Sequence, residues 1–425
     1  MGDYFIFDPK ILIRPPYSDC PKCREKDSYG ILSIESDYYS RRCKKCWYDE
    51  SYPLPNLTKQ IIYLDQFVIS NMMKSINPKI KVADKNNEYF RELFFKLEFL
   101  AKAHIIVCPD STIHYDESIM SMHYRDIRSM YKHLSFETSF LPTSTINRYH
   151  FVSAFKKYLA GDDDILIEKA AVCSGYNEWK ERFRIEIETY SEEKDRNQNN
   201  EIKQARFQSL QPVFERWKIQ KPFIFNDIFM FELSSSVIGF INRYKRYLTE
   251  IIKANKGIIY NIDEFIGDET ILLVNEMIED IKVYKGCDDI FESLTIIEQF
   301  SKSNILLEIP NLRIECLLWA ALARKAAAGQ KNLNISIVND IYAISSYMPY
   351  SNAIFIDKEC YALLTDVDVA ARIQCNTEVF SLSNKEEFLE YLDRLIAKVP
   401  KQHIELIKNV YGEDWLKPYS SMYKL

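Results

Sequence analysis

Two short apolar runs, each ending in an aspartate, constrain most strongly how this chain can fold. Residues 61–65 read Ile-Ile-Tyr-Leu-Asp, and residues 353–357 read Ala-Ile-Phe-Ile-Asp. Such a run is typical of a strand buried on both faces, as in a parallel sheet between two layers of helices. We therefore expect an α/β fold with both aspartates at the carboxyl edge of the sheet, where open α/β sheets bind ligands.

Two further segments extend this pattern. The apolar run at 105–109 leads into Ser111, His114 and Glu117, and the helix expected before the second aspartate-tipped strand carries Asp340 near its start. Aspartate is depleted in strands, and one that follows a strand usually caps the next helix. A functional interpretation therefore requires several of these acids to meet at one place.

Three blocks of this sequence resemble the PIN-like nuclease superfamily. They are Tyr-Leu-Asp-Gln at 63–66, Pro-Asp-Ser-x-x-His-x-x-Glu at 109–117, and Asn-Asp-Ile…Pro-Tyr-Ser-x-Ala-x-Phe-x-Asp at 339–357. The resemblance implies a parallel sheet flanked by helices, whose strand ends present three or four acids to a divalent metal. The acids that match are Asp65, Glu117, Asp340 and Asp357.

The resemblance implies that these four acids are catalytic. We expect Asp65, Asp340 and Asp357 to bind Mg²⁺ or Mn²⁺ directly, and Glu117 to bind it through oxygen or through water. Clustered carboxylates repel one another, and a hard divalent cation makes their proximity tolerable. Such a cation lowers the pKa of the water it binds, so that this water can attack a phosphodiester. The candidate substrate-binding residues are Gln66, Ser111, His114 and Asn339, although a lone histidine on a half-apolar helix is more often structural.

Two Cys-x-x-Cys pairs near the start of the chain predict a separate metal site. Cys20 and Cys23 precede Cys43 and Cys46 by the spacing of a four-thiolate zinc site, and the segment resembles a zinc ribbon. A unit of about 50 residues buries little apolar surface, so bound zinc would supply much of its stability. The remaining cysteines are scattered, which favours metal binding in a reducing cytosol over a disulfide framework.

Basic residues surround the second cysteine pair and leave two interpretations open. Arg41, Arg42, Lys44 and Lys45 stand next to Trp47. Cations interleaved with aromatic residues suit phosphate contact and base stacking. The same cations would also offset the negative charge of a zinc–thiolate centre.

The chain divides into four expected segments. These are a zinc ribbon at 1–55, a first PIN-like part at 56–124, a mainly helical insertion at 125–305 and a second PIN-like part at 306–425. Early strand–helix units, a helical block and further strand–helix units indicate one α/β domain that is interrupted by the insertion.

Several stretches outside the motifs carry alternatives. The polar run at 190–206 is expected to be an exposed helix or a mobile loop. The basic-aromatic stripes at 155–158 and 242–247 would either line a nucleic-acid channel or form helix faces with buried aromatics and solvated cations. Glu315 is expected to face solvent or to form a salt bridge.

Composition limits the partners. A net charge of −6 gives no overall attraction to nucleic acid, so binding must come from local patches. No apolar run approaches the roughly 20 residues of a membrane span, and no signal peptide opens the chain. We therefore expect a cytoplasmic protein without membrane contact, with a possible protein partner at the ribbon or the insertion.

The function expected from these features is that of a metal-dependent nuclease, acting on RNA rather than DNA. By analogy, it could serve as a bacterial toxin or a defence effector. Two alternatives stay open. One is a zinc-ribbon and PIN-like module that binds RNA or protein without catalysis, and the other is a DNA-directed nuclease.

Overall fold

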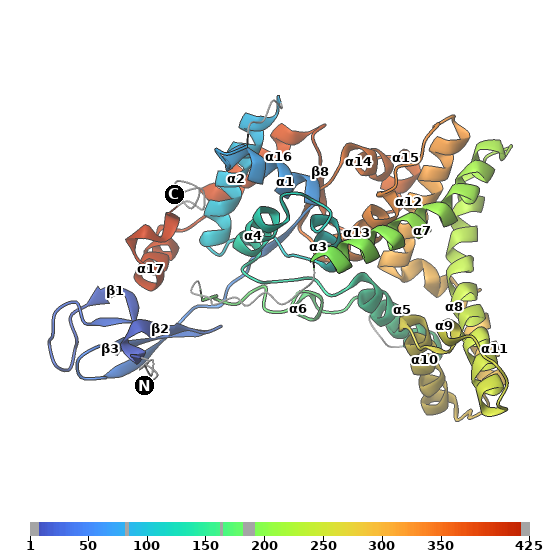
Figure 1. Ribbon diagram of the computed structural model, residues 1–425, viewed down its shortest axis with the longest axis horizontal. Helices are drawn as coiled ribbons and strands as arrows, with labels where there is room; N and C mark the ends of the chain where they lie inside the picture. Colours follow the sequence, from blue (N-terminus) through green and yellow to red (C-terminus); the bar gives the residue numbers. More distant parts are fainter. Residues whose placement is uncertain (1–7, 81–84, 162–164, 182–191, 418–425) are drawn as a thin grey trace.

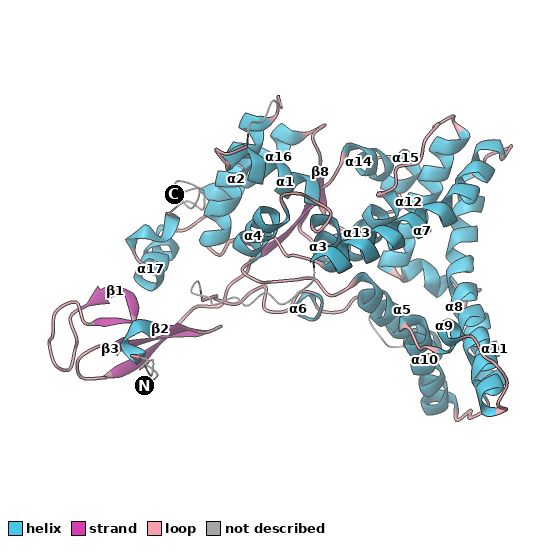
Figure 2. Ribbon diagram, in the orientation of Figure 1, coloured by secondary structure: helices cyan, strands magenta, loops and turns pink. Residues whose placement is uncertain are grey.

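The computed structural model describes residues 8–80, 85–161, 165–181 and 192–417. It shows two small four-stranded sheets and many helices, and it is 60% helical (Figures 1 and 2). The expectation of a mixed α/β fold with a parallel sheet is confirmed. None of the helices in the described ranges has the length and apolar composition that a membrane span requires.

The first sheet holds the cysteine pairs. Its antiparallel strands, in spatial order, are β1 (Arg14–Ser18), β2 (Tyr29–Ile34), β3 (Tyr38–Cys43) and β4 (Asp49–Pro53). The residues between the two cysteine pairs form an antiparallel hairpin, β2–β3. Gly30 lets β1 lie close to β2, because a Cβ at this position would be 2.4 Å from the Arg14 carbonyl oxygen.

The second sheet is the parallel one, and all three of its strand pairs are parallel. In spatial order its strands are β6 (Ile106–Val107), β5 (Gln60–Leu64), β7 (Ala353–Phe355) and β8 (Glu378–Phe380). β6 is shorter than the apolar run at 105–109 from which it comes. Leu64 pairs with Phe355, so the residues that follow β5 and β7 emerge at the same edge.

Alternating side chains of β5 explain why helices cover both faces of this sheet. Ile61 and Tyr63 join one apolar core, and Ile62 and Leu64 join the other. Helices α1 (Gln66–Ile76), α2 (Asn87–Lys102), α4 (Tyr124–Ser135) and α16 (Lys385–Ala397) cover the Leu64 face. Helices α5 (Thr143–Ala160), α12 (Pro310–Ala327) and α13 (Ile337–Tyr347) cover the Tyr63 face.

Helix α12 is the centre of the second helical layer. It is buried on nearly all sides and packs against α13 and against two long helices, α7 (Glu192–Ile219) and α8 (Phe225–Asn255). Glu315 on α12 accepts a hydrogen bond from Trp319 Nε1 at 3.2 Å, and burial raises the pKa of its carboxyl to about 7. Glu315 is thus half-buried and bonded to Trp319, and no salt bridge of its carboxylate occurs among the described residues.

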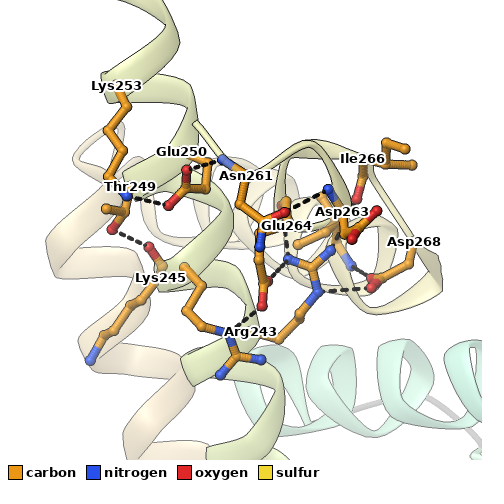
Figure 3. A network of polar contacts seen from close by, with 12 residues as sticks. Arg243, Lys245, Thr249, Glu250, Lys253, Asn261, Asp263, Glu264, Ile266 and Asp268 are labelled. Carbon is orange, nitrogen blue, oxygen red and sulfur yellow. Dashed lines mark hydrogen bonds and ion pairs between the residues drawn. The ribbon is translucent and has the colours of Figure 1, made fainter. Parts of the chain in front are cut away.

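Helices also dominate the described residues between 125 and 305. Besides α5, α7 and α8, they include α6 (Lys169–Val172), α9 (Ile262–Phe265), α10 (Glu269–Lys285) and α11 (Ile290–Phe300). In the stripe at 242–247, Arg243 binds Asp268 at 2.9 Å and Glu264 at 3.0 Å (Figure 3), while Tyr244 is buried. This stripe is a helix face with a buried aromatic ring and a paired cation, the second of the two interpretations.

A small apolar core joins the first sheet to later parts of the chain. Trp179 packs with Ile31 of β2 and with Trp415, and its Nε1 donates to the Pro55 carbonyl at 2.9 Å. Arg14 Nη1 lies 2.6 Å from Glu181 Oε1. The remaining α-helices are α3 (Thr112–Ser118), α14 (Lys358–Leu364), α15 (Val367–Ala370) and α17 (Lys401–Tyr411), of which α17 contacts β1. The N-terminal sheet thus packs against the segment that contains Trp179 and Glu181 and against helix α17.

Candidate acidic metal site and four-cysteine cluster

One cavity of about 290 Å³ lies at the carboxyl edge of the parallel sheet. Six of the residues that the sequence indicated line it: Asp65, Gln66, Glu117, Asn339, Asp340 and Asp357. The four acids come from four separate elements of the chain and nevertheless face the same space.

The strand ends position two of these acids. Asp65 follows β5 and caps α1, where its side chain accepts a hydrogen bond from the Phe67 amide at 3.0 Å. Asp357 follows β7 and caps α14, where it accepts a hydrogen bond from the Cys360 amide at 2.6 Å. Both aspartates are therefore helix caps, and capping does not take either residue away from the cavity that it lines.

Helices supply the other two acids. Glu117 lies near the end of α3, and Asp340 lies in the first turn of α13. A neighbour of Glu117, Asp116, lines the cavity as well. These helices end and begin beside the sheet edge, so their carboxylates join those of β5 and β7.

Burial disfavours the charged form of Asp65, Glu117 and Asp340 and so raises the pKa of each. It is the main cause that raises the pKa of Asp65 to about 7, and the charge of Asp357 raises it further. Burial, followed by the charge of Asp65, raises the pKa of Glu117 to about 8. Burial and then the charges of Asp65 and Glu117 raise the pKa of Asp340 well above its usual range. A bound divalent cation would offset both the desolvation and the repulsion.

Potential ligand atoms of Asp340, Asp357 and Cys360 lie within 4.8 Å of one another. Asp65 is not part of this group, although it lines the same cavity. Burial raises the pKa of the Cys360 thiol well above its usual range, and the charge of Asp340 adds to this effect. Since Mg²⁺ and Mn²⁺ prefer oxygen ligands, the carboxylates rather than the thiol fit such a cation.

Helix α7 brings cations to the acidic cavity. Lys203 and Arg206 line it, and the charge of Lys203 lowers the pKa of Glu117. Arg206 Nη1 donates to Asn339 Oδ1 at 2.6 Å, and Asn199 donates to Asp116 at 3.1 Å. From residue 192 onward, the polar run at 190–206 is therefore a helix that covers the cavity, and residues 190–191 lie outside the described ranges.

Ser111 and His114 do not line the cavity. Ser111 Oγ accepts a hydrogen bond from the His114 amide at 3.2 Å and so caps α3. The His114 ring stacks between Tyr63 and Tyr131, with centroid distances of 5.1 Å and 4.6 Å, and burial lowers its pKa. Both residues support the helix that carries Glu117, which is the structural interpretation of His114.

The four predicted cysteines form a second candidate metal site. Their sulfur atoms lie within 4.8 Å of one another, with 3.6 Å between Cys20 and Cys46 and 3.7 Å between Cys23 and Cys43. Four sulfurs placed tetrahedrally around zinc at about 2.3 Å are about 3.8 Å apart. The cluster is therefore positioned to bind a metal ion, and its geometry and all-sulfur composition fit zinc.

The backbone forms the same kind of turn at each of the two Cys-x-x-Cys pairs. Arg24 and Trp47, each directly after a Cys-x-x-Cys pair, both have positive φ, at 56° and 61°. Burial opposes ionisation of the Cys43 thiol, but amides of Cys46 and Lys45 donate to its sulfur and its pKa falls to about 6. The turns thus direct backbone donors at a sulfur that a metal would bind as thiolate.

The basic residues near the cysteines contact their own sheet. Arg41 donates to the Pro16 and Tyr29 carbonyls at 2.8 Å and 2.7 Å, and Arg42 lies 3.9 Å from Asp49. Lys44 lies over the Tyr17 ring, and Lys45 pairs with Glu25. None of these four cations lines the acidic cavity.

Lys203, Arg206 and Cys360 were not indicated by the sequence motifs. Cys360 had a usable signal, since it lies one helical turn after Asp357. The α7 cations had none, because they approach the cavity only through the tertiary fold. No protein-family model matches the chain, and no match was found among curated proteins or solved structures.

Proposed function

We propose that this protein is a metal-dependent nuclease with a PIN-like fold that hydrolyses phosphodiester bonds in RNA. The observation that carries the proposal is the convergence of Asp65, Glu117, Asp340 and Asp357 on one cavity. Half-buried carboxylates that gather at one cavity favour a divalent cation, because it offsets their desolvation and their mutual repulsion. RNA is the substrate class that the resemblance of the three sequence blocks implies.

The carboxylates would hold Mg²⁺ or Mn²⁺. Ligand atoms of Asp340 and Asp357 lie within 4.8 Å of each other, and Asp65 and Glu117 line the same cavity. When bound, such a cation supplies activation of water for in-line attack and stabilisation of charge on the leaving oxygen. The caps that Asp65 and Asp357 form fix the two carboxylates before any cation arrives, so little ordering is needed on binding.

The α7 cations would bind the substrate backbone. Lys203 and Arg206 stand at the cavity that the acids line, so a phosphate there meets positive charge from one side. Arg206 also holds the Asn339 amide, which can then orient a phosphate oxygen or water. Because the whole chain is acidic, these local cations have to supply the attraction.

The cysteine cluster has a structural part in this proposal. Zinc at Cys20, Cys23, Cys43 and Cys46 would stabilise the N-terminal sheet, and it takes no part in hydrolysis. The cations of that sheet could still extend the RNA-binding surface, although they already contact neighbouring residues.

Cleavage assays on labelled single-stranded RNA and DNA of the same sequence test the proposal. We expect RNA cleavage with Mn²⁺ or Mg²⁺, none in EDTA, and a loss on the order of 100-fold in Asp65→Asn and Asp357→Asn. Glu390→Gln, an exposed acid on α16, is the matched control and should cleave normally. Tight RNA binding without cleavage in any metal would indicate a binding module, and preferential DNA cleavage would indicate a DNA-directed nuclease.

A further inference from the structure

A second cavity, of about 500 Å³, lies at the amino ends of β7 and β8. Ser351 and Asn352, which precede β7, line it together with Thr377, which precedes β8. The acidic cavity lies at the other, carboxyl end of the same strands. The second cavity therefore shares no residue with the first, and its volume is in the range of small-molecule sites.

The charged residues of this second cavity are mostly basic. Lys157, Lys169 and Arg313 line it, and the carboxylate of Glu308 does so as well. Glu308 is already engaged, since its Oε2 lies 2.8 Å from Lys157 Nζ. The described lining thus has an excess of positive charge.

Arg313 is the most informative of these residues. It is only 8% exposed, and its Nη1 donates to two neutral acceptors, the Leu307 carbonyl and Gln374 Oε1, both at 2.8 Å. Its Nε is buried without a hydrogen-bond partner, and no carboxylate in the described ranges forms an ion pair with it. A buried guanidinium with an unused donor is costly, and an acceptor from a ligand would remove that cost.

Lys169 is a second cation at this cavity that forms no ion pair with a described residue. It lies half-buried on α6, and no ion pair or hydrogen bond of its ammonium group occurs among the described residues. Burial lowers its pKa, so the site favours its charged form less than water does. An anion in the cavity would restore the favourable environment for this charge.

We propose that this second cavity binds a phosphate-bearing small molecule. Arg313 offers a planar fork of donors that matches phosphate oxygens, and Lys169 offers a compact positive charge. The volume exceeds that of a lone phosphate, and the exposed amides of Gln374 and Asn376 can bind the rest of the ligand. This proposal does not depend on nuclease activity.

A ligand in the second cavity would stabilise the parallel sheet. The backbone amide of Asn352 donates to the Ile61 carbonyl at 2.7 Å, and its side-chain Oδ1 accepts from the Ile61 backbone amide at 2.9 Å. Its carbonyl accepts from the Glu378 amide at 3.0 Å. One lining residue therefore joins β5, β7 and β8, so an occupied cavity should raise the melting temperature of the whole protein.

The test is calorimetric titration of the full chain with inorganic phosphate, pyrophosphate, ADP and, for comparison, acetate, at constant ionic strength. EDTA is present throughout, so that a metal at the acidic cavity cannot recruit the nucleotide. We expect saturable binding of pyrophosphate or ADP with a rise in melting temperature, and affinity weakened about tenfold or more in Arg313→Lys and Lys169→Gln. Lys245→Gln, an exposed cation on α8, is the control and should bind normally.

Three results would overturn the proposal. One is the absence of saturable binding for every phosphate compound, and another is unchanged affinity in both variants. The third is equally tight binding of acetate, which would assign the cavity to carboxylates instead. Should Arg313→Lys fail to fold, Lys169→Gln decides alone, because Lys169 has no described contact whose loss would unfold the protein. Ligand affinity and melting temperature are measured without any cleavage assay. The result of this test is therefore independent of whether the protein cleaves RNA.

Discussion

Asp65 and Asp357 cap the helices that follow two paired strands, and the Asp65 amide donates a hydrogen bond to the Phe355 carbonyl at 3.0 Å. Capping and metal binding can be tested separately at these two positions. Asparagine caps a helix about as well as aspartate does, but it lacks the negative charge that a metal ion needs. Substitution by asparagine therefore tests metal binding alone, and substitution by alanine tests capping as well.

We predict that Asp65→Asn and Asp357→Asn change the free energy of unfolding by less than about 1 kcal/mol in EDTA, because the caps remain. Both variants should lose the rise in melting temperature that Mn²⁺ gives the natural protein. Asp65→Ala should lose the cap as well, at a cost of about 1 kcal/mol. Denaturant unfolding with and without Mn²⁺ measures both effects. A full Mn²⁺ response in the asparagine variants would contradict the metal site.

A second prediction concerns the cations of α7. Lys203→Gln and Arg206→Gln should weaken RNA binding, because each removes a positive charge from the cavity that the acids line. We expect KM to rise by about fivefold to tenfold per variant while kcat changes less, with a shallower salt dependence. Steady-state cleavage at several salt concentrations measures this, with Lys245→Gln as the control. Unchanged KM in both variants would remove α7 from the substrate site.

A third prediction concerns zinc. The purified chain should contain one zinc ion, and Cys43→Ser should lose it together with the ordered structure of β1–β4. Because Trp415 packs with Ile31 of this sheet, amide exchange near α17 should also quicken. Elemental analysis and hydrogen exchange measure these losses. Mn²⁺ affinity at the acidic cavity should stay within about twofold, since no cysteine of the cluster lines it. Joint loss of both metal sites would show that they do not act separately.

A fourth prediction concerns pH. His150 is buried between Asn311 and Tyr350, which bond its two ring nitrogens, and burial lowers its pKa to about 4. Below its ordinary pKa of about 6.5, the unfolded chain takes up a proton that the folded chain does not. The free energy of unfolding should therefore fall by about 3 kcal/mol as pH drops from 6.5 to 4, and this contribution should level off below pH 4.

Denaturant unfolding across this pH range checks the fourth prediction. His150→Gln is the comparison, because the other titrating groups contribute equally to both proteins. The difference between the two curves should shrink as pH falls from 6.5 to 4. A constant difference would show that the folded state accommodates a charged His150.

The sequence predicted the parts of the site that depend on local pattern. The apolar runs before Asp65 and Asp357 indicated β5 and β7, because strands buried on both faces lack polar residues. The cysteine spacing indicated the cluster, because a tetrahedral site needs two tight turns brought together. The local pattern determined these features almost completely.

Features that depend on distant contacts were harder to predict. The apolar residues of helix α7, among them Phe214 and Trp217, lie in its C-terminal half and pack into the core. Its N-terminal half is polar and contacts the cavity residues through Asn199 and Arg206, so no apolar stripe there indicates that this half reaches the cavity. Ser111 and His114 were assigned to substrate by motif, but one caps α3 and the other fills the space beneath it. Cys360 was overlooked because a lone buried cysteine is common in protein cores.

The spread of the acids along the chain also has a consequence for protein synthesis. A ribosome that has translated the chain only as far as α13 has made Asp65, Glu117 and Asp340, but not β7 or the Asp357 that follows it. Such a nascent chain lacks both β7 and Asp357, so it would not yet contain the complete site that we propose. Activity of the proposed kind would begin only once the last part of the polypeptide has emerged and paired with β5.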